Sequence, residues 1–160
     1  MAKSEFFENW LKTHSKNGYE DYVQIFPIKD LSTSCIGFHI PYKISDSYRH
    51  IDSFTVHGIL CSEYVFSERR WEYYADIDYN TKTNEARLVD NFVKENVRRI
   101  GLGSLGLTYI KQFLKTIGCR EISGVKHPIP NSHEEMAKLT AFYQKNGFEN
   151  LASNGILYRF

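Results

Sequence analysis

A long amphipathic helix between two short strand-like segments restricts the folds open to this sequence. Apolar residues recur at helical spacing from Leu102 to Ile117 without interruption, and Gly118 follows as a helix-ending residue. Strand-like residues precede this helix at 85–93 and follow it at 121–126. A strand–helix–strand unit forms a right-handed crossover, so we expect the two strands to be parallel neighbours in one sheet.

The segments before this unit predict antiparallel strands. Strand-like residues run over 51–64 and over 70–78, and a turn-forming segment at 80–84 separates the second run from 85–93. Two strands joined by a short turn pair antiparallel, because a parallel pair needs a longer crossover. Residues 19–50 show no clear periodicity.

Both ends of the chain carry helix signals. Ser4 is placed to cap a first helix that Asn17-Gly18 would close. Ser132 and Glu135 form a capping box, in which each side chain should bond the other's backbone amide, and the helix should end at Asn146-Gly147. Ser153-Asn154-Gly155 then predicts a tight hairpin turn. The fold class is therefore α/β (α+β), with a mixed sheet flanked by helices.

The length and composition favour one domain over residues 1–160. The chain is 42% hydrophobic and 24% charged, which is typical of a folded soluble protein. It contains no apolar run long enough to cross a bilayer, and acidic residues interrupt its apolar start, which disfavours a secretory signal. Its three cysteines are widely spaced, and its six histidines show no metal-ligand spacing. We expect a cytoplasmic protein without a disulfide framework or a bound metal.

Charge and aromatic residues are distributed unevenly. Residues 1–84 have a net charge of −3 and residues 85–160 one of +4, neither of which suggests binding to nucleic acid or to a membrane. This division would suit an anionic cofactor and a cationic substrate. Residues 1–84 also hold 16 of the 24 aromatic residues. An aromatic core is one explanation, and an aromatic-lined substrate groove is the alternative.

The start of the long helix predicts an anion-binding site. The first backbone amides of a helix have no partner within it, and the helix dipole adds positive potential there. Gly101 and Gly103 let an anion approach this backbone closely, while Arg98 and Arg99 add positive charge. The alternative is a strand-to-helix turn that needs glycines for its geometry alone.

A dinucleotide fingerprint is a second interpretation of these glycines. Residues 101–106 spell G-x-G-x-x-G, and Glu121 lies twenty residues after the first glycine. The motif, however, follows antiparallel strands and leaves only 54 residues beyond Gly106, too few for two mononucleotide-binding halves. Close packing of the helix also explains Gly106, so we disfavour this interpretation.

Two motifs resemble the GNAT superfamily of acetyl-CoA-dependent N-acyltransferases. Residues 98–103 (Arg-Arg-Ile-Gly-Leu-Gly) are similar to its Arg/Gln-x-x-Gly-x-Gly/Ala signature, and Val93 matches a valine that closes the preceding strand. Residues 143–148 (Tyr-Gln-Lys-Asn-Gly-Phe) resemble its Tyr-x-x-x-Gly-Phe element. The resemblance covers residues 85–150, which it implies to be the acetyl-CoA-binding core, with residues 1–84 as the variable substrate side.

The resemblance implies a specific fold and cofactor site. The parallel strands at 85–93 and 121–126 would splay apart, and pantetheine would lie between them. The backbone of Phe92, Val93 and Lys94 would then contact pantetheine and the thioester carbonyl. Backbone amides at the helix start would hold the pyrophosphate. The residues in this second group are Arg98, Arg99, Ile100, Gly101, Leu102, Gly103 and Ser104.

The resemblance also implies that Tyr143 is the general acid. A hydroxyl group near the sulfur would protonate the departing CoA thiolate. The alternative is that Tyr143 belongs to a buried helix stripe with Met136 and Leu139. Two departures from the family pattern are that many members have Gly where Arg99 stands, and that Met136 occupies the place of a frequent Asn.

The sequence does not identify the general base. Glu85 and Asp90 should lie on opposite faces of their strand by simple alternation. Glu72, Asp76 and Asp78 should share one face of the neighbouring strand. Each is an ordinary candidate for a solvated carboxylate, and together they would attract a cationic amine.

The resulting hypothesis is an N-acetyltransferase that moves an acetyl group from acetyl-CoA directly to a primary amine of a small molecule or a peptide. The alternative is a non-catalytic acyl-CoA-binding module that serves as a sensor or recruits a partner. The final strand, ending at Phe160, would offer an exposed edge for a homodimer.

Overall fold

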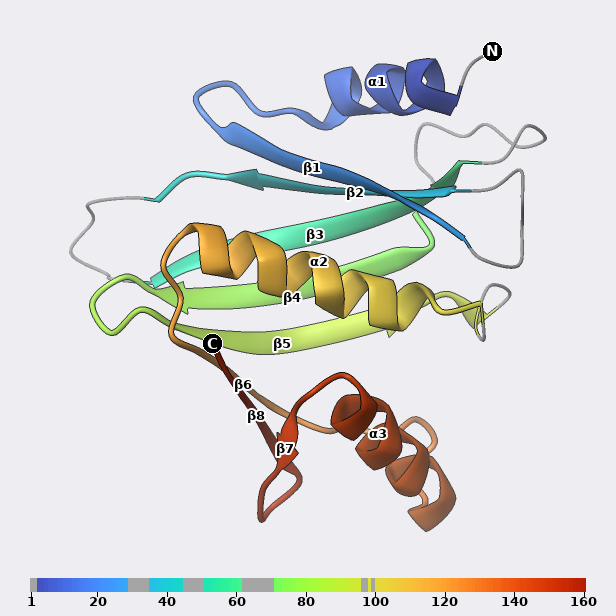
Figure 1. Ribbon diagram of the computed structural model, residues 1–160, viewed down its shortest axis with the longest axis vertical. Coiled ribbons are helices and arrows are strands. Elements are labelled where there is room, and N and C mark those ends of the chain that lie inside the picture. Colours follow the sequence, from blue (N-terminus) through green and yellow to red (C-terminus); the bar gives the residue numbers. More distant parts are fainter. Residues whose placement is uncertain (1–2, 29–34, 45–50, 62–70, 96–97, 99) are drawn as a thin grey trace.

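The computed structural model describes residues 3–28, 35–44, 51–61, 71–95, 98 and 100–160. These residues form three helices and eight strands (Figure 1). In chain order they are α1 (Lys3–His14), β1 (Glu20–Pro27), β2 (Cys35–Tyr42), β3 (Ile51–Cys61), β4 (Tyr73–Asn80), β5 (Glu85–Val93), α2 (Leu102–Thr116), β6 (Glu121–Val125), α3 (His133–Lys145), β7 (Glu149–Asn150) and β8 (Gly155–Arg159).

All eight strands belong to one mixed sheet in the order β1-β2-β3-β4-β5-β6-β8-β7. Neighbouring strands are antiparallel except for β5 and β6, which are parallel, with Glu85 opposite Glu121 and Leu88 opposite Gly124. The predicted crossover and the antiparallel β4–β5 pair are both confirmed. Among the described residues, no helix is long and apolar enough to cross a membrane.

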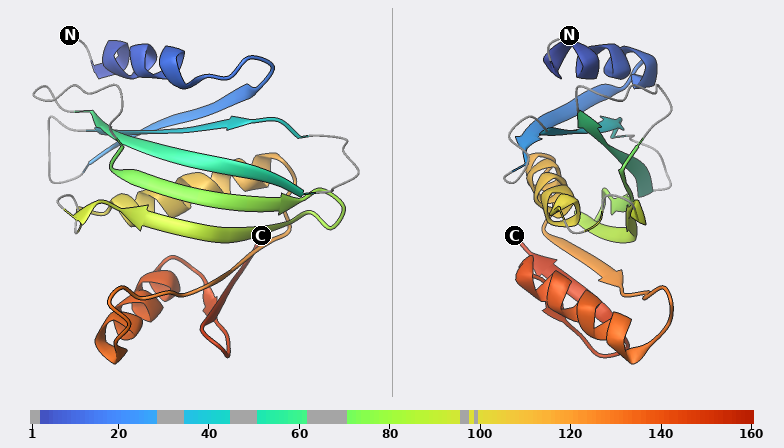
Figure 2. Two further views of the ribbon diagram at one scale, coloured as in Figure 1. Left: turned by 180° about the vertical axis from the view of Figure 1, so that it is seen from behind. Right: turned by 90° about the vertical axis from the view of Figure 1, so that its right-hand side faces the viewer.

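Helix α2 covers one face of the sheet. It lies in front of β3, β4 and β5 in Figure 1, and these strands lie in front of it in the reverse view of Figure 2. Its Tyr109 stacks on Phe38 and its Phe113 packs edge-on against Phe54, with all four rings almost fully buried. The predicted helical period therefore marks the face that meets the sheet, and an aromatic core is confirmed.

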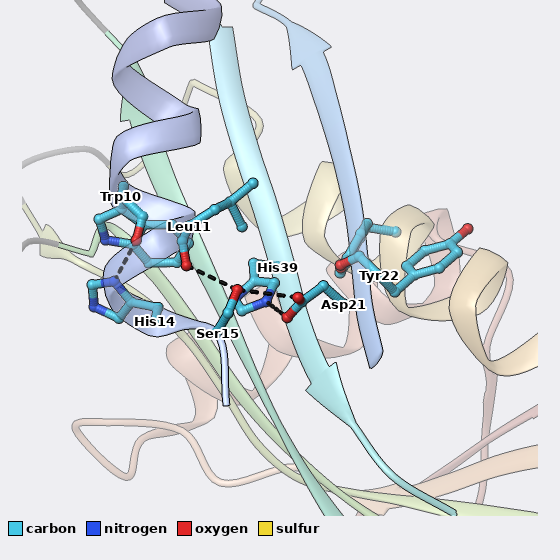
Figure 3. A network of polar contacts seen from close by, with 8 residues as sticks. Trp10, Leu11, His14, Ser15, Asp21, Tyr22 and His39 are labelled. Atoms are coloured by element: carbon cyan, nitrogen blue, oxygen red, sulfur yellow. Dashed lines mark hydrogen bonds and ion pairs between the residues drawn. The ribbon is translucent and has the colours of Figure 1, made fainter. Parts of the chain in front are cut away.

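Helix α1 packs against the opposite face of β2 and β3. Its Trp10 is buried with Cys35 and Ile59, whose side chains point away from the α2 side by strand alternation. Figure 3 shows the end of this helix beside His39, whose Nε2 lies 2.7 Å from Asp21 Oδ1. Because α1 begins at Lys3, Ser4 lies inside the helix rather than at its N-cap, so that prediction was wrong.

The C-terminal elements agree with their predicted bounds, with two corrections to their contacts. Ser132 Oγ accepts a hydrogen bond of 3.2 Å from the Glu135 backbone N–H, as the capping box predicts, whereas the Glu135 carboxylate accepts from Lys138. Ser153 and Asn154 both have positive φ in the hairpin turn. Strand β8 lies between β6 and β7, so the expectation that it forms an exposed edge was wrong; β7 is the edge strand at this end of the sheet.

Candidate active site

The two parallel strands separate halfway along β5. They pair only from Glu85 and Glu121 to Leu88 and Gly124, while β5 continues to Val93 paired with β4 alone. Figure 1 shows β6 turning away from β5 beyond this point. The predicted splay is therefore confirmed. Backbone groups of β5 beyond Leu88 face the opening, where pairing with β6 has ended.

A cavity of about 70 Å³ lies in this opening. Because about 10–15 Å³ of such space holds one water molecule, the cavity has room for several water molecules. Its lining combines apolar side chains from the strands and α3 with polar groups from β5, from the loop after β6 and from α3. The lining residues are Leu88, Val89, Asp90, Asn91, Val125, His127, Leu139, Tyr143 and Ile156.

A β-bulge in β5 lies next to the opening. Leu88 pairs with Ile77 and Asp90 pairs with Asp76, so that Val89 is an extra residue in β5. The extra residue reverses the alternation of side chains along the rest of the strand. Glu85 and Asp90 therefore lie on the same face, opposite Asn80 and Asp76, and the expectation of opposite faces was wrong.

The carboxylates on this face are held by hydroxyl groups. Asp76 accepts hydrogen bonds from Thr55 at 3.0 Å and from Tyr74 at 2.6 Å, and Asp78 accepts one from Ser53 at 2.7 Å. The bond to Asp76 and partial burial raise the pKa of Tyr74 to about 12, so this phenol stays a donor. Asp76 and Asp78 do share one strand face, as predicted.

Glu72 has a different environment from these aspartates. Its side chain is 1% exposed, and its Oε2 accepts a hydrogen bond of 2.7 Å from the Leu60 backbone N–H. It is thus committed to a structural bond before β4 begins. Of the five carboxylates considered from the sequence, Asp90 is the one that lines the cavity in the described part of the chain.

Tyr143 lies at the cavity and is 7% exposed. Its hydroxyl oxygen accepts a hydrogen bond of 3.4 Å from Asn91 Nδ2. Burial raises the pKa of the phenol, Asp90 adds to this increase, and the bond from Asn91 acts in the opposite direction. Leu139, which the alternative interpretation placed in one buried stripe with Tyr143, also lines the cavity. The stripe and the cavity lining therefore belong to the same face of α3.

The structure adds three residues that the sequence did not single out for the site. Asn91 and His127 line the cavity, and Tyr73 donates a hydrogen bond of 2.5 Å to Asn91 Oδ1. Asn91 and His127 stand near the carboxyl ends of the two parallel strands, where ligands bind in open α/β sheets. Their positions near the ends of the two predicted parallel strands could have identified both residues from the sequence.

The start of α2 has free amides and an open approach. Gly101 is the N-cap, with a φ of +85°, and a Cβ placed on it would meet nothing within 4 Å. The first helical bond runs from the Leu105 N–H to the Gly101 carbonyl, so the preceding amides have no partner in the helix. This geometry suits an anion at the helix N-terminus.

Gly103 and Ser104 also connect α2 to α3. A Cβ on Gly103 would lie 3.1 Å from the ring of Phe142, so the glycine also serves helix packing. Ser104 Oγ accepts a hydrogen bond of 3.1 Å from Asn146 Nδ2. The turn interpretation therefore explains part of the glycine pattern, and the Ser104 side chain is already bonded within the protein.

The other predicted cofactor residues gather at the end of β5. Arg98 Nε donates a hydrogen bond of 3.1 Å to the Val93 carbonyl, and its guanidinium lies 5.7 Å from the centre of the Phe92 ring. The Lys94 N–H donates to the Glu72 carbonyl at 2.9 Å. Two of the strand-end backbone groups are thus already bonded.

Three predicted residues remain from this group. Leu102 is buried in the core. Ile100 packs partly buried against the core. Arg99 lies outside the described residues.

The fold is that of the GNAT acetyltransferases. A GNAT family acetyltransferase from Elizabethkingia anophelis with acetyl-CoA bound matches at a TM-score of 0.55, with 10% identity over 78% of this chain and 98% of that one. Tetrahymena GCN5 matches at a TM-score of 0.52, with 9% identity over 69% of each chain. The PaiA N-acetyltransferase of Thermoplasma acidophilum in complex with coenzyme A matches at 0.50, with 17% identity over 68% of this chain and 62% of that one. No protein-family model and no curated protein matches the sequence.

Proposed function

We propose that this protein is an N-acetyltransferase that moves an acetyl group from acetyl-CoA directly to a primary amine. The observation that carries the proposal is the position of Tyr143 beside the free part of β5, in the cavity between the separated parallel strands. A hydroxyl group, an unpaired strand edge and a narrow opening are together what a thioester with a linear pantetheine arm requires.

The residues present fit acetyl-CoA as a co-substrate. Pantetheine amides would pair with backbone groups of β5 between Val89 and Val93, where pairing with β6 has ended. The pyrophosphate would accept hydrogen bonds from the first amides of α2, above the open approach at Gly101. Arg98 and Arg99 would add positive charge near this helix start.

The chemistry then needs few protein groups. The neutral amine attacks the thioester carbon, the C–S bond breaks, and the CoA sulfur leaves with the electron pair. Tyr143 gives its proton to this sulfur, and the ammonium form of the product amide loses one proton to a base. Because burial raises the pKa of Tyr143, the phenol is protonated and ready to donate at neutral pH.

The acceptor is proposed to be a cationic amine with apolar parts. Asp90 at the cavity and Asp76 beside it supply negative charge, while Trp71, Tyr74 and Phe92 form an aromatic cluster next to them. Asp90 and His127 are the cavity-lining groups placed to take the amine proton. On this proposal residues 1–84 supply most of the acceptor side, and residues 85–150 bind acetyl-CoA.

Thermal unfolding with acetyl-CoA, CoA, NAD or no ligand tests the cofactor first. A ligand at a hundredfold excess over its Kd stabilises the folded state by about 2.7 kcal/mol. We expect acetyl-CoA and CoA to raise the midpoint and NAD to leave it unchanged. A response to NAD alone would instead support the dinucleotide interpretation.

A pair of variants at Gly101 locates the pyrophosphate. Gly101→Asn and Gly101→Asp place side chains of similar size at the same positive φ, and asparagine and aspartate both tolerate that conformation better than most residues. Only aspartate adds a negative charge at the helix start. We expect CoA to bind Gly101→Asn more tightly than Gly101→Asp, and equal affinities would place the pyrophosphate elsewhere.

A screen of amines with detection of the released thiol then tests turnover. Acetyl-CoA binding with acetyl transfer to one or more cationic amines supports the enzyme. Tight binding of acetyl-CoA with no thiol release across the screen, and no effect of Tyr143→Phe on any measured property, would favour the acyl-CoA-binding module.

A further inference from the structure

We propose that Asn91 is a positioning residue, held by Tyr73, that orients the Tyr143 hydroxyl so that its proton points into the cavity. The inference rests on the proposed function, since it assigns a role in the same transfer. Three elements supply the three side chains: Tyr73 comes from β4, Asn91 from β5 and Tyr143 from α3. Residues 73 and 143 are brought together only by the folded sheet.

The hydrogen bonds run in one direction through these residues. The Tyr73 hydroxyl donates to Asn91 Oδ1 at 2.5 Å, and Asn91 Nδ2 donates to the Tyr143 oxygen at 3.4 Å. Tyr73 is 0% exposed and Tyr143 is 7% exposed, so the chain of bonds begins in the core and ends at the cavity. Asn91, half-buried, is the link between them.

The buried Tyr73 proton decides which way the Asn91 amide points. A buried hydroxyl proton without an acceptor is costly, and Asn91 Oδ1 satisfies this one. With the oxygen turned toward Tyr73, the NH₂ group of the same amide must face Tyr143. A flipped amide would instead place its oxygen against Tyr143 and draw the Tyr143 proton away from the cavity.

Accepting this bond leaves the Tyr143 proton for another acceptor. The bond uses one lone pair of the Tyr143 oxygen, and the O–H remains available to a group in the cavity, such as a developing thiolate. A donor to the phenol oxygen also stabilises its ionised form, which makes Tyr143 a stronger acid than burial alone would allow. The other titratable groups near Tyr143 are Tyr73, Asp90 and His127.

Helix α2 leaves space for the Tyr73 ring because residue 106 is a glycine. A Cβ on Gly106 would lie 2.3 Å from Tyr73 Cζ and 2.7 Å from its hydroxyl oxygen. The glycine therefore admits the ring at the depth where its hydroxyl reaches Asn91. Gly106 thus has a structural reason in this protein that is separate from any nucleotide motif.

The test compares Asn91→Asp with Asn91→Leu in protein carrying ¹³Cζ-labelled tyrosine. Aspartate keeps the shape and the bond from Tyr73, yet it can only accept at Tyr143, so the direction of that bond is inverted. Leucine removes both bonds at similar size. NMR titration of the unliganded protein reports the pKa of Tyr143, with its resonance assigned by its loss in Tyr143→Phe.

We expect the Tyr143 pKa to rise in both variants, and more in Asn91→Asp. We also expect kcat to fall at least about tenfold in Asn91→Asp, with the acetyl-CoA KM within about twofold of wild type. In the Tyr143→Phe background, Asn91→Asp should change kcat less than about twofold, because both residues act through one proton. Tyr73→Phe should lower kcat less than Asn91→Asp does.

An unchanged Tyr143 titration in both folded Asn91 variants would overturn the proposal, whatever the activity. The NMR result needs no turnover, so it separates this inference from the proposed function. If the titration shifts as expected while wild-type protein transfers no acetyl group to any amine, the positioning role of Asn91 stands and the proposed enzyme activity fails.

Discussion

Asp76 and Asp90 stand directly opposite each other across β4 and β5. The bulge at Val89 creates this pair, because without the extra residue Asp90 would face the other side of the sheet. Like charges directly opposite are destabilising. Hydroxyl donors to Asp76, and the Asn91 N–H at 2.8 Å from Asp90, partly offset that repulsion. A repelling pair beside the cavity is consistent with a role for Asp90 in binding a cation.

Removing the charge of Asp90 should stabilise the fold and weaken the binding of a cationic amine. We expect Asp90→Asn to raise the free energy of unfolding by about 0.5 kcal/mol, since it relieves the repulsion with Asp76. We also expect it to raise the KM for a cationic amine several-fold and to leave the affinity for CoA unchanged. Urea denaturation, amine kinetics and CoA titration measure the three quantities.

Asp78→Asn is the matched control for this change. Asp78 lies on the same face as Asp76 but stands opposite Arg87, so its charge faces an opposite one. Its neutralisation should lower the free energy of unfolding by about 0.5 kcal/mol. The explanation from cross-strand charge is wrong if both variants shift stability in the same direction.

Tyr143→Phe tests the general acid. We expect kcat to fall about 100-fold with little change in acetyl-CoA affinity, because only the proton to the sulfur is lost. Burial raises the pKa of Tyr143 over that of a free phenol, so the rate of the wild-type protein should fall only at strongly alkaline pH, where Tyr143 loses its proton. A pH profile of kcat checks this: the variant should lack that alkaline decrease. A decrease of equal size and midpoint in both proteins would assign it to another group.

The histidines beneath α1 predict acid sensitivity of the fold. His57 stands opposite His39 in the sheet, and burial lowers both pKa values, that of His57 to about 4. His14 and Lys16 lower the His57 value further, while Asp76 opposes them, and Asp21 opposes the decrease at His39. The unfolded chain therefore binds protons more readily below pH 6.5. Stability is present above that pH and is lost as the pH falls toward 4.

Urea denaturation at several pH values between 7 and 4.5 measures this loss. A shift from 6.5 to about 4 corresponds to about 3 kcal/mol for His57, most of which should disappear from the pH dependence in His57→Gln. His133→Gln, at an exposed position in α3, is the control and should keep the wild-type dependence. Identical curves for wild type and His57→Gln would mean that His57 does not couple protonation to unfolding.

Gly106→Ala should destabilise the protein although alanine favours helices. The new Cβ would lie 2.3 Å from Tyr73 Cζ, and Tyr73 is fully buried and has no room to move. Overpacking of this kind costs about 1–3 kcal/mol, against a gain in helix propensity of about 1 kcal/mol, so we expect a net loss of about 1 kcal/mol. Thr108→Ala, exposed on the same helix, should leave stability unchanged or slightly raised. Equal unfolding free energies for Gly106→Ala and wild type would contradict the close packing of Tyr73.

Local patterns predicted the central part of the fold well. The apolar period from Leu102 to Ile117 depends only on which face of a helix is apolar, and α2 covers that span almost completely. The crossover rule then made β5 and β6 parallel, and the glycines at 118 and 147 both have positive φ, as their predicted places at helix C-termini require. Each of these features is determined by residues close together in the chain.

The N-terminal half was harder to predict because its order comes from distant partners. Strands β1 and β2 fall in the segment without clear periodicity, yet they pair over eight residues each. The side chains of β2 contact α1 on one face and α2 on the other, β1 also contacts α2, and α2 lies some eighty residues along the chain from β1. The strand propensity of individual residues does not predict a contact with a helix so distant in the sequence.

The sequence by itself determined the strand–helix–strand unit, the glycine-rich helix start and the presence of Tyr143 near the end of α3. Only the tertiary structure decided which groups meet Tyr143. A bulge depends on how two strands pair, and Val89 gives no local sign that it will be the extra residue. That one insertion turned Asp90 to the face of Asp76 and left Asn91 between Tyr73 and Tyr143, because side chains in a strand alternate from wherever the pairing resumes.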